Sequence, residues 1–158
     1  MEQEIIFNEH NKQEYPPMHT AEHILNCTMV KMFGCPRSRN AHIERKKSKC
    51  DYQLAAAPTE AQVAELEARV NEVIDRHLDV TVEFVDRDHV PPEVDLGKLP
   101  SDASETLRLV RVGDYDVCAC AGTHVQNTSE IAPFKIISHD YNPETHIWRI
   151  RFNLLEAK

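Results

Sequence analysis

The chain has little glycine and no long apolar run. Only four of its 158 residues are glycine, and it contains no repeats or low-complexity tracts, so repetitive and fibrous architectures are excluded. No apolar segment approaches the roughly 20 residues that a membrane-spanning helix needs. The start, Met-Glu-Gln-Glu, lacks the basic residues and the apolar core of a signal peptide. We therefore expect a single globular domain with a core of its own.

The cysteines do not form a disulfide framework that can be read from the sequence. There are five of them, an odd number, and their spacing does not match that of a small disulfide-rich domain. We therefore expect a reducing, cytoplasmic setting. The positions are Cys27, Cys35, Cys50, Cys118 and Cys120.

Positive charge is in the minority but unevenly distributed. The formal net charge is -8, which argues against a general nucleic-acid binder with a basic field. The segment 37–49 nevertheless holds six lysines and arginines against Glu44 alone. One basic face on an acidic body can meet a polyanion. The alternative is a solvated basic loop without a partner.

Helical periodicity predicts two long helices. In 18–33 the apolar residues recur at helical spacing, and Gly34 and Pro36 follow as helix-ending residues. The second helix begins at Thr59, which forms a capping-box sequence with Gln62, and runs to about residue 78.

Alternating and β-branched segments predict about six to eight strands, mostly joined by hairpins. The natural interpretation is an α+β fold, with an antiparallel sheet packed with the two long helices. Residues 88–105, rich in proline and acidic side chains, are predicted to form a surface loop. The predicted strands are 3–7, 40–45, 49–54, 80–85, 106–112, 115–120, 131–138 and 146–154.

Two pairs of side chains, each with a spacing of four residues, predict a zinc site. His19 and His23 share one face if their segment is helical. Cys120 and His124 follow about a hundred residues later, and imidazole and thiolate are the usual zinc ligands. The alternative is that Cys120 is a small buried residue and His124 a turn residue. His-x-x-Glu-His also matches an inverted zinc-peptidase pattern with Glu22 as base, but such enzymes need a distal carboxylate and a far larger chain.

The same residues resemble a known family. His-Thr-Ala-x-His-Ile-Leu at 19–25 is similar to the opening motif of the alanyl-tRNA synthetase editing domain, and Cys-x-Gly-Thr-His-Val at 120–125 to its second motif. The run Asn-Thr-Ser-Glu-Ile at 127–131 and Phe-Lys-Ile-Ile-Ser at 134–138 also resembles the family. The threonyl branch usually has proline where this chain has Thr123, so the alanine branch is favoured. The resemblance covers 18–154.

The resemblance implies a freestanding editing protein of the AlaX type, in its short form. Residues 1–158 are then one editing domain with the fold of the alanyl/threonyl-tRNA synthetase second additional domain, without an N-terminal barrel subdomain. It implies hydrolysis of mischarged tRNA(Ala), chiefly Ser-tRNA(Ala) and also Gly-tRNA(Ala), with the acceptor end of that tRNA as partner. It further implies zinc as cofactor. The implied zinc ligands are His19, His23, Cys120 and His124.

Roles for other residues are predicted as well. The hydroxyls of Thr20 and Thr123 can bind a seryl side chain and so reject alanine, or they are cap and turn hydroxyls. Glu22 is expected to point away from the histidines and is not assigned as general base. The candidates for contacts with tRNA phosphates are Arg45, Lys46, Lys47 and Lys49.

Departures and alternatives remain open. Ala121 and Ser129 stand where the family usually has glycine, and Cys118 is an alternative thiolate, although Cys120 keeps the motif's spacing. Three other functions are compatible with the residues. They are editing of Ser-tRNA(Thr), a non-catalytic zinc domain that binds RNA or protein, and hydrolysis of a small ester or amide.

Overall fold

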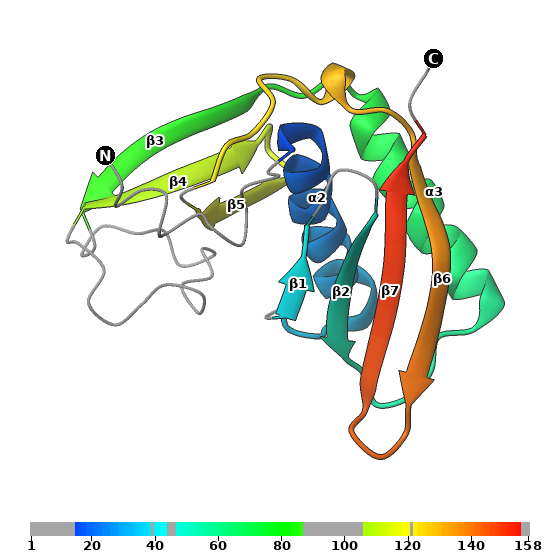
Figure 1. The fold of residues 1–158 in the computed structure, drawn as a ribbon. Coiled ribbons are helices and arrows are strands. Elements are labelled where there is room, and N and C mark those ends of the chain that lie inside the picture. The colour runs from blue at the N-terminus through cyan, green and yellow to red at the C-terminus, as the bar shows by residue number, and fades with distance from the viewer. Residues whose placement is uncertain (1–14, 39, 44–46, 87–105, 121, 156–158) are drawn as a thin grey trace.

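The computed structural model describes residues 15–38, 40–43, 47–86, 106–120 and 122–155. In this part of the chain, two long helices combine with seven antiparallel strands (Figure 1), which confirms the α+β class. The predicted strand at 3–7 and loop at 88–105 lie outside the described residues. The elements are α2 (Pro16–Phe33), β1 (Asn40–His42), β2 (Ser48–Gln53), α3 (Glu60–Asp75), β3 (Val80–Asp86), β4 (Thr106–Val112), β5 (Asp116–Ala119), the short 3-10 helix η3 (Thr128–Glu130), β6 (Phe134–Asn142) and β7 (Ile147–Leu154).

The strands form two sheets rather than one. A four-stranded sheet has the order β1-β2-β7-β6, and a three-stranded sheet has the order β3-β4-β5. Figure 1 shows the three-stranded sheet extending away from the body that α2, α3 and the larger sheet form together. Every pairing is antiparallel, as the hairpin-rich sequence predicts. The chain returns from the smaller sheet to α3 and the larger sheet through η3.

Helix α2 is the central element of the body. It ends at Gly34, which adopts a φ of 69° and donates its N–H to the carbonyl of Val30; only glycine takes this left-handed conformation readily. Ten of its residues are buried. Several of these are polar, so the helix is enclosed on more than its apolar side. The buried polar residues are Thr20, Glu22, His23, Asn26 and Thr28.

Helix α3 is a simpler amphipathic element. Thr59 accepts the N–H of Gln62, whose side chain accepts the N–H of Thr59 in return, which confirms the predicted capping box. Its four buried residues are all apolar: Leu66, Val70, Val73 and Ile74. The helix ends at Asp75, earlier than predicted, and His77 has a φ of 54°, which takes the chain out of the helical direction.

The larger sheet has an inner face and an outer face. Along β7 each second residue is buried, namely Trp148, Ile150, Phe152 and Leu154. These side chains pack in the same core as α2 and α3. The alternate residues of β2 and β7 point to the opposite side of the sheet, which we call the outer face. Within the described residues, no helix is long and apolar enough to span a membrane.

Candidate metal centre

Two distant segments bring the predicted ligands together. His19 and His23 lie on the first turns of α2, and Cys120 and His124 flank the loop that follows β5. One donor atom from each of the four lies within 4.8 Å of the others. The pairs predicted from the sequence therefore converge on one point. Three imidazoles and one thiol are a donor set that suits zinc.

Hydrogen bonds turn two of the imidazole rings toward the thiol. His19 Nδ1 donates to the carbonyl of Thr123 at 3.1 Å, which leaves Nε2 facing Cys120 Sγ at 3.6 Å. His124 Nδ1 is bonded to Thr20 Oγ1 at 2.8 Å, and its Nε2 faces Cys120 Sγ at 3.5 Å. A metal-binding histidine is usually held in this way through its other ring nitrogen. The orientation is thus built into the fold.

Two of the imidazoles have pKa values that are shifted in opposite directions. Burial lowers the pKa of His124 to about 3, helped by the nearby charges of His19 and Arg108, so this ring stays neutral and keeps a lone pair. Burial also lowers the pKa of His19, but the hydrogen bond and charge of Cys120 outweigh it and raise the value to about 9. A bound metal cation would take the place of the proton on His19.

The loop that carries Cys120 is fixed by Arg108 of β4. Its guanidinium donates to the carbonyl of Cys120 at 2.8 Å and to that of Gly122 at 2.7 Å. The N–H of Gly122 donates to Cys120 Sγ at 3.4 Å, which helps to hold the position of the sulfur. Arg108 was not predicted, because nothing in the sequence shows that it faces this loop.

Cys118 belongs to a second cluster on the other side of His23. Its Sγ lies 3.4 Å from His23 Nδ1, and Asp116 lies 3.7 Å from the same nitrogen. Asp116 is bound by both terminal nitrogens of Arg37, at 2.8 and 3.3 Å. Burial raises the pKa of the Cys118 thiol well above its usual value. The structure therefore favours Cys120 as the thiolate ligand.

A small cavity of about 50 Å³ adjoins three of the four donor residues, namely His19, His23 and Cys120. Contrary to expectation, Glu22 lines it together with both helix histidines, and the Glu22 side chain is almost fully buried. Asn26 donates to the Glu22 carboxylate at 2.7 Å and accepts from Tyr52 at 2.6 Å. Glu22 was misplaced because α2 is enclosed nearly all round, so a residue about 100° away from a histidine still faces the interior. Arg37, Cys118, Ala119 and Cys120 complete the lining.

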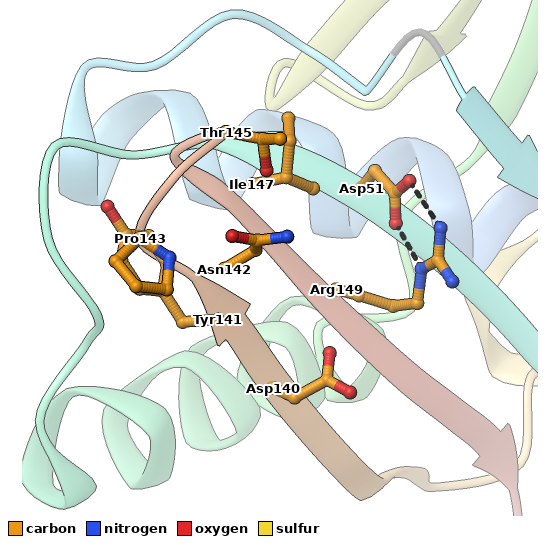
Figure 2. Close-up of a pocket in the computed structure, with 8 residues that line it drawn as sticks. All are labelled: Asp51, Asp140, Tyr141, Asn142, Pro143, Thr145, Ile147 and Arg149. Carbon is orange, nitrogen blue, oxygen red and sulfur yellow. Dashed lines mark hydrogen bonds and ion pairs between the residues drawn. The ribbon is translucent and has the colours of Figure 1, made fainter.

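A larger hollow of about 510 Å³ lies elsewhere, on the outer face of the sheet near the β6–β7 hairpin. Figure 2 shows Arg149 reaching from β7 to Asp51 of β2, with Asp140 on the other side. No histidine or cysteine is among its described lining residues. Size alone would point to this hollow, but the side chains that could hold a metal ion lie at the small cavity.

The threonines and basic residues that were predicted as site residues lie at different places in the fold. Thr20 is fully buried, and its oxygen also accepts the N–H of Val125. Thr123 is exposed and contributes its carbonyl oxygen to His19. Lys47 and Lys49 lie on or beside β2, on the outer side of the sheet. Arg45 and Lys46 lie outside the described residues.

Comparison with known proteins supports this picture. Residues 107–151, which include Cys120 and His124, match the family described as threonyl and alanyl tRNA synthetase second additional domain. The match to this second additional domain extends over 107–151 of the chain. The resemblance stated from the sequence motifs is thereby confirmed.

Relatives of the second additional domain extend the similarity beyond the matched residues. The chain is 33% identical over 137 residues to an alanyl-tRNA editing protein, AlaX-L, of Pyrococcus horikoshii, which covers 85% of this chain and 32% of that protein. It is 33% identical over 121 residues to an alanine–tRNA ligase of Fervidobacterium nodosum, covering 76% and 14%. A ligase of Lactococcus lactis is 32% identical over 126 residues, covering 77% and 14%. The chain thus spans about a third of the length of the AlaX-L protein.

The run after His124 has a clear structural role in the second additional domain. Asn127 and Glu130 form a capping box around η3. Thr128 bonds to the carbonyl of Ile74 and accepts the N–H of Leu78, which ties this run to the end of α3. Ser129, where the family usually has glycine, lies within η3, whose backbone any residue adopts. Ala121 lies outside the described residues.

Proposed function

We propose that this protein is a zinc-dependent deacylase. It hydrolyses the ester bond of mischarged tRNA(Ala), chiefly Ser-tRNA(Ala), with Gly-tRNA(Ala) as a second substrate. The observation that carries the proposal is the convergence of His19, His23, Cys120 and His124, within a chain similar to a protein named for alanyl-tRNA editing. A freestanding short form that consists of one domain over 1–158 remains a prediction, as does the cytoplasmic setting.

The four donors would hold the zinc ion. A bound zinc supplies a positive charge that polarises a carbonyl group or lowers the pKa of a water molecule. The protein's own contribution is orientation: the Thr123 carbonyl holds the His19 ring, and the Thr20 hydroxyl holds the His124 ring. Direct contact of either threonine with the substrate remains a prediction.

The small cavity gives a physical basis for selecting serine. With about 50 Å³ of space it accepts a side chain of a few atoms and excludes large ones. Its walls include the Glu22 carboxylate and the Asn26 amide. We propose that a seryl hydroxyl donates to Glu22 there. The methyl group of an alanyl ester cannot do so and would leave the buried carboxylate without that partner.

A second candidate function is a structural zinc domain that binds RNA without catalysis. It is favoured by the count of donors, because four protein ligands are typical of closed structural sites, whereas catalytic zinc keeps an open position. His19 and Cys120 are only half-buried, so the side on which they lie is open to a substrate. We therefore prefer the catalytic function. Thr123 likewise argues against Ser-tRNA(Thr) as the main substrate.

The decisive experiment measures hydrolysis of Ser-tRNA(Ala) and Ala-tRNA(Ala) in parallel, with the zinc-loaded protein and with Cys120→Ser. We expect fast loss of the seryl ester, sparing of the alanyl ester, and loss of activity in the variant. Decay of both esters at the rate without enzyme, by a protein that retains zinc, would refute the deacylase proposal. The structural zinc domain would then stand.

A further inference from the structure

The register of the four-stranded sheet arranges charged residues in rows. On the outer face, His42 of β1 pairs with Lys49 of β2, and Lys49 pairs with Arg151 of β7. Lys47, just before β2, lies beside these residues and lines the same groove. We call His42, Lys47, Lys49 and Arg151 the basic row. Residues far apart in the sequence thus bring the positive charges of Lys47, Lys49 and Arg151 together on one face, with the His42 imidazole beside them.

The neighbouring row is neutralised by the fold. Arg149 lies directly opposite Asp51 on β2 and Asp140 on β6. Its guanidinium binds the Asp51 carboxylate with two nitrogens, at 2.7 and 2.9 Å. This row therefore has internal partners, as Figure 2 shows. The basic row lies two residues further along the same strands, on the same face of the sheet.

The basic row has far less internal compensation. Within the described part of the chain, Arg151 pairs with the exposed Asp140, at 3.4 Å, and donates to Ser138. Among the described residues, neither Lys47 nor Lys49 has an ion pair with a carboxylate. Like charges that lie directly opposite one another in a sheet are destabilising. Folding therefore does not explain why Lys49 faces Arg151, and an external anion does.

The basic row lines a groove of about 270 Å³. Its described lining residues are the four members of the row and Ser48, so no carboxylate is among them. This stands out in a chain with a net charge of -8. Neighbouring strands lie about 4.8 Å apart, and Lys47 lies two residues along the chain from Lys49, so the groove presents several cations side by side rather than at one point. Cations spread in this way fit a polyanion better than a single small anion.

We propose that the basic row binds the sugar-phosphate backbone of an RNA, which would be the acceptor stem of the tRNA substrate. This part of the inference rests on the proposed function. Lysine and arginine contacts to phosphates position a nucleic acid without reading its sequence. The basic row therefore anchors the stem, and recognition of the amino acid is left to the small cavity beside the metal ligands.

The test uses an unacylated acceptor-stem RNA duplex, whose binding to the zinc-loaded protein is measured by fluorescence anisotropy over a range of salt concentrations. Lys49→Gln and Arg151→Gln should each weaken binding and reduce the slope of log affinity against log salt by about one. Arg69→Gln removes an exposed cation on α3 that pairs with Glu65, and it should leave both quantities unchanged. Equal losses in all three variants would overturn the proposal.

Thermal stability separates binding from a structural role. Because Lys49 faces Arg151, Lys49→Gln should melt no lower than the unaltered protein at low salt, while it binds RNA more weakly. A clear loss of stability with unchanged RNA binding would refute the inference, as would binding to anionic lipid vesicles in preference to the RNA. The duplex carries no ester, so a failure of hydrolysis leaves this result intact. Conversely, if variants of the basic row still hydrolyse the ester at the original rate, the anchoring role is refuted and the deacylase proposal is not.

Discussion

The two long helices are built on opposite principles. Helix α3 buries four residues, all of them apolar, and its first turn is closed by its own capping box. Helix α2 has no side-chain cap, and half of its ten buried residues are polar. Each of these polar groups takes its partner from outside the helix or from a neighbouring turn. His23, for example, faces Cys118 and Asp116 of β5.

This difference between the helices indicates that α3 mainly contributes to stability and that α2 mainly carries the candidate site. Burying polar groups is costly unless each is hydrogen-bonded. The apolar buried face of α3 shows that a helix of this fold can pack without buried polar groups. A protein usually departs from the simplest packing where a site demands it. Two of the four candidate metal donors and the small cavity lie along α2, whereas α3 supplies the apolar surface that supports it. Changes to the two helices should therefore have different consequences.

The largest effect is expected for His23→Ala in α2. Loss of a donor should remove zinc binding and hydrolysis, by more than the roughly 10–100-fold that loss of an orienting group costs. Zinc content by atomic absorption and the rate of ester hydrolysis are the measurements. His77→Asn, at the end of α3, is the matched control, since asparagine tolerates the positive φ of that position. Retention of zinc by His23→Ala would contradict the assigned ligand set.

Leu66→Ala in α3 should show the reverse pattern. Leu66 is fully buried, and truncation of such a side chain typically costs about 2–5 kcal/mol in the free energy of unfolding. Urea denaturation measures this cost. The folded fraction should still bind zinc with its original stoichiometry. A parallel loss of zinc from protein that remains folded would show that the two helices are not separable in this way.

A smaller effect is expected for Thr20→Val, which keeps the shape of the side chain and removes the hydroxyl that holds His124. Zinc affinity should fall about 10–100-fold, as measured by competition with a chelator. Thr20→Ser, which restores the hydroxyl, should recover most of the loss. Equal zinc affinity in Thr20→Val would mean that the His124 ring needs no such support.

The smallest effect is expected for Thr59→Ala at the start of α3. Loss of the capping hydroxyl should cost about 1 kcal/mol in the free energy of unfolding, measured by thermal denaturation. Thr59→Asp, which keeps an acceptor at the cap, should lie close to the unaltered protein. Hydrolysis and zinc content should not change in either variant. An effect on zinc would break the division between α2 and α3.

The sequence predicted α3 more completely than α2. The capping box of Thr59 and Gln62 and the apolar stripe are local, so they can be recognised without knowing what packs against them. The existence of α2 and the pairing of its histidines with Cys120 and His124 were also predicted, through spacing and family resemblance. Its enclosure was not, because this depends on β5 and on loops distant in the chain.

The features that were missed all depend on long-range contacts. Arg37 and Asp116 form an ion pair although they are 79 residues apart. The sequence around each of them does not indicate that the other is its partner. Helical geometry places Glu22 about 100° from each neighbouring position, which predicts that it faces away from the two histidines. This prediction leaves out the elements that enclose the other sides of α2. The division into two sheets was also missed, since hairpins give strand pairs but not the point at which one sheet ends. Each of these needs the packed structure.

The distance in sequence between the two ligand pairs has a consequence for the order of events during folding. His19 and Cys120 are 101 residues apart, and closing so long a segment is slow because its entropy must be lost before any contact forms. An ion can therefore be held by all four donors only after α2 and the end of β5 have come together. Capture of the metal follows chain assembly rather than nucleating it, and the segment that contains Cys120 and His124 must be in place first. Zinc added during refolding should accordingly leave the folding rate unchanged and slow unfolding instead.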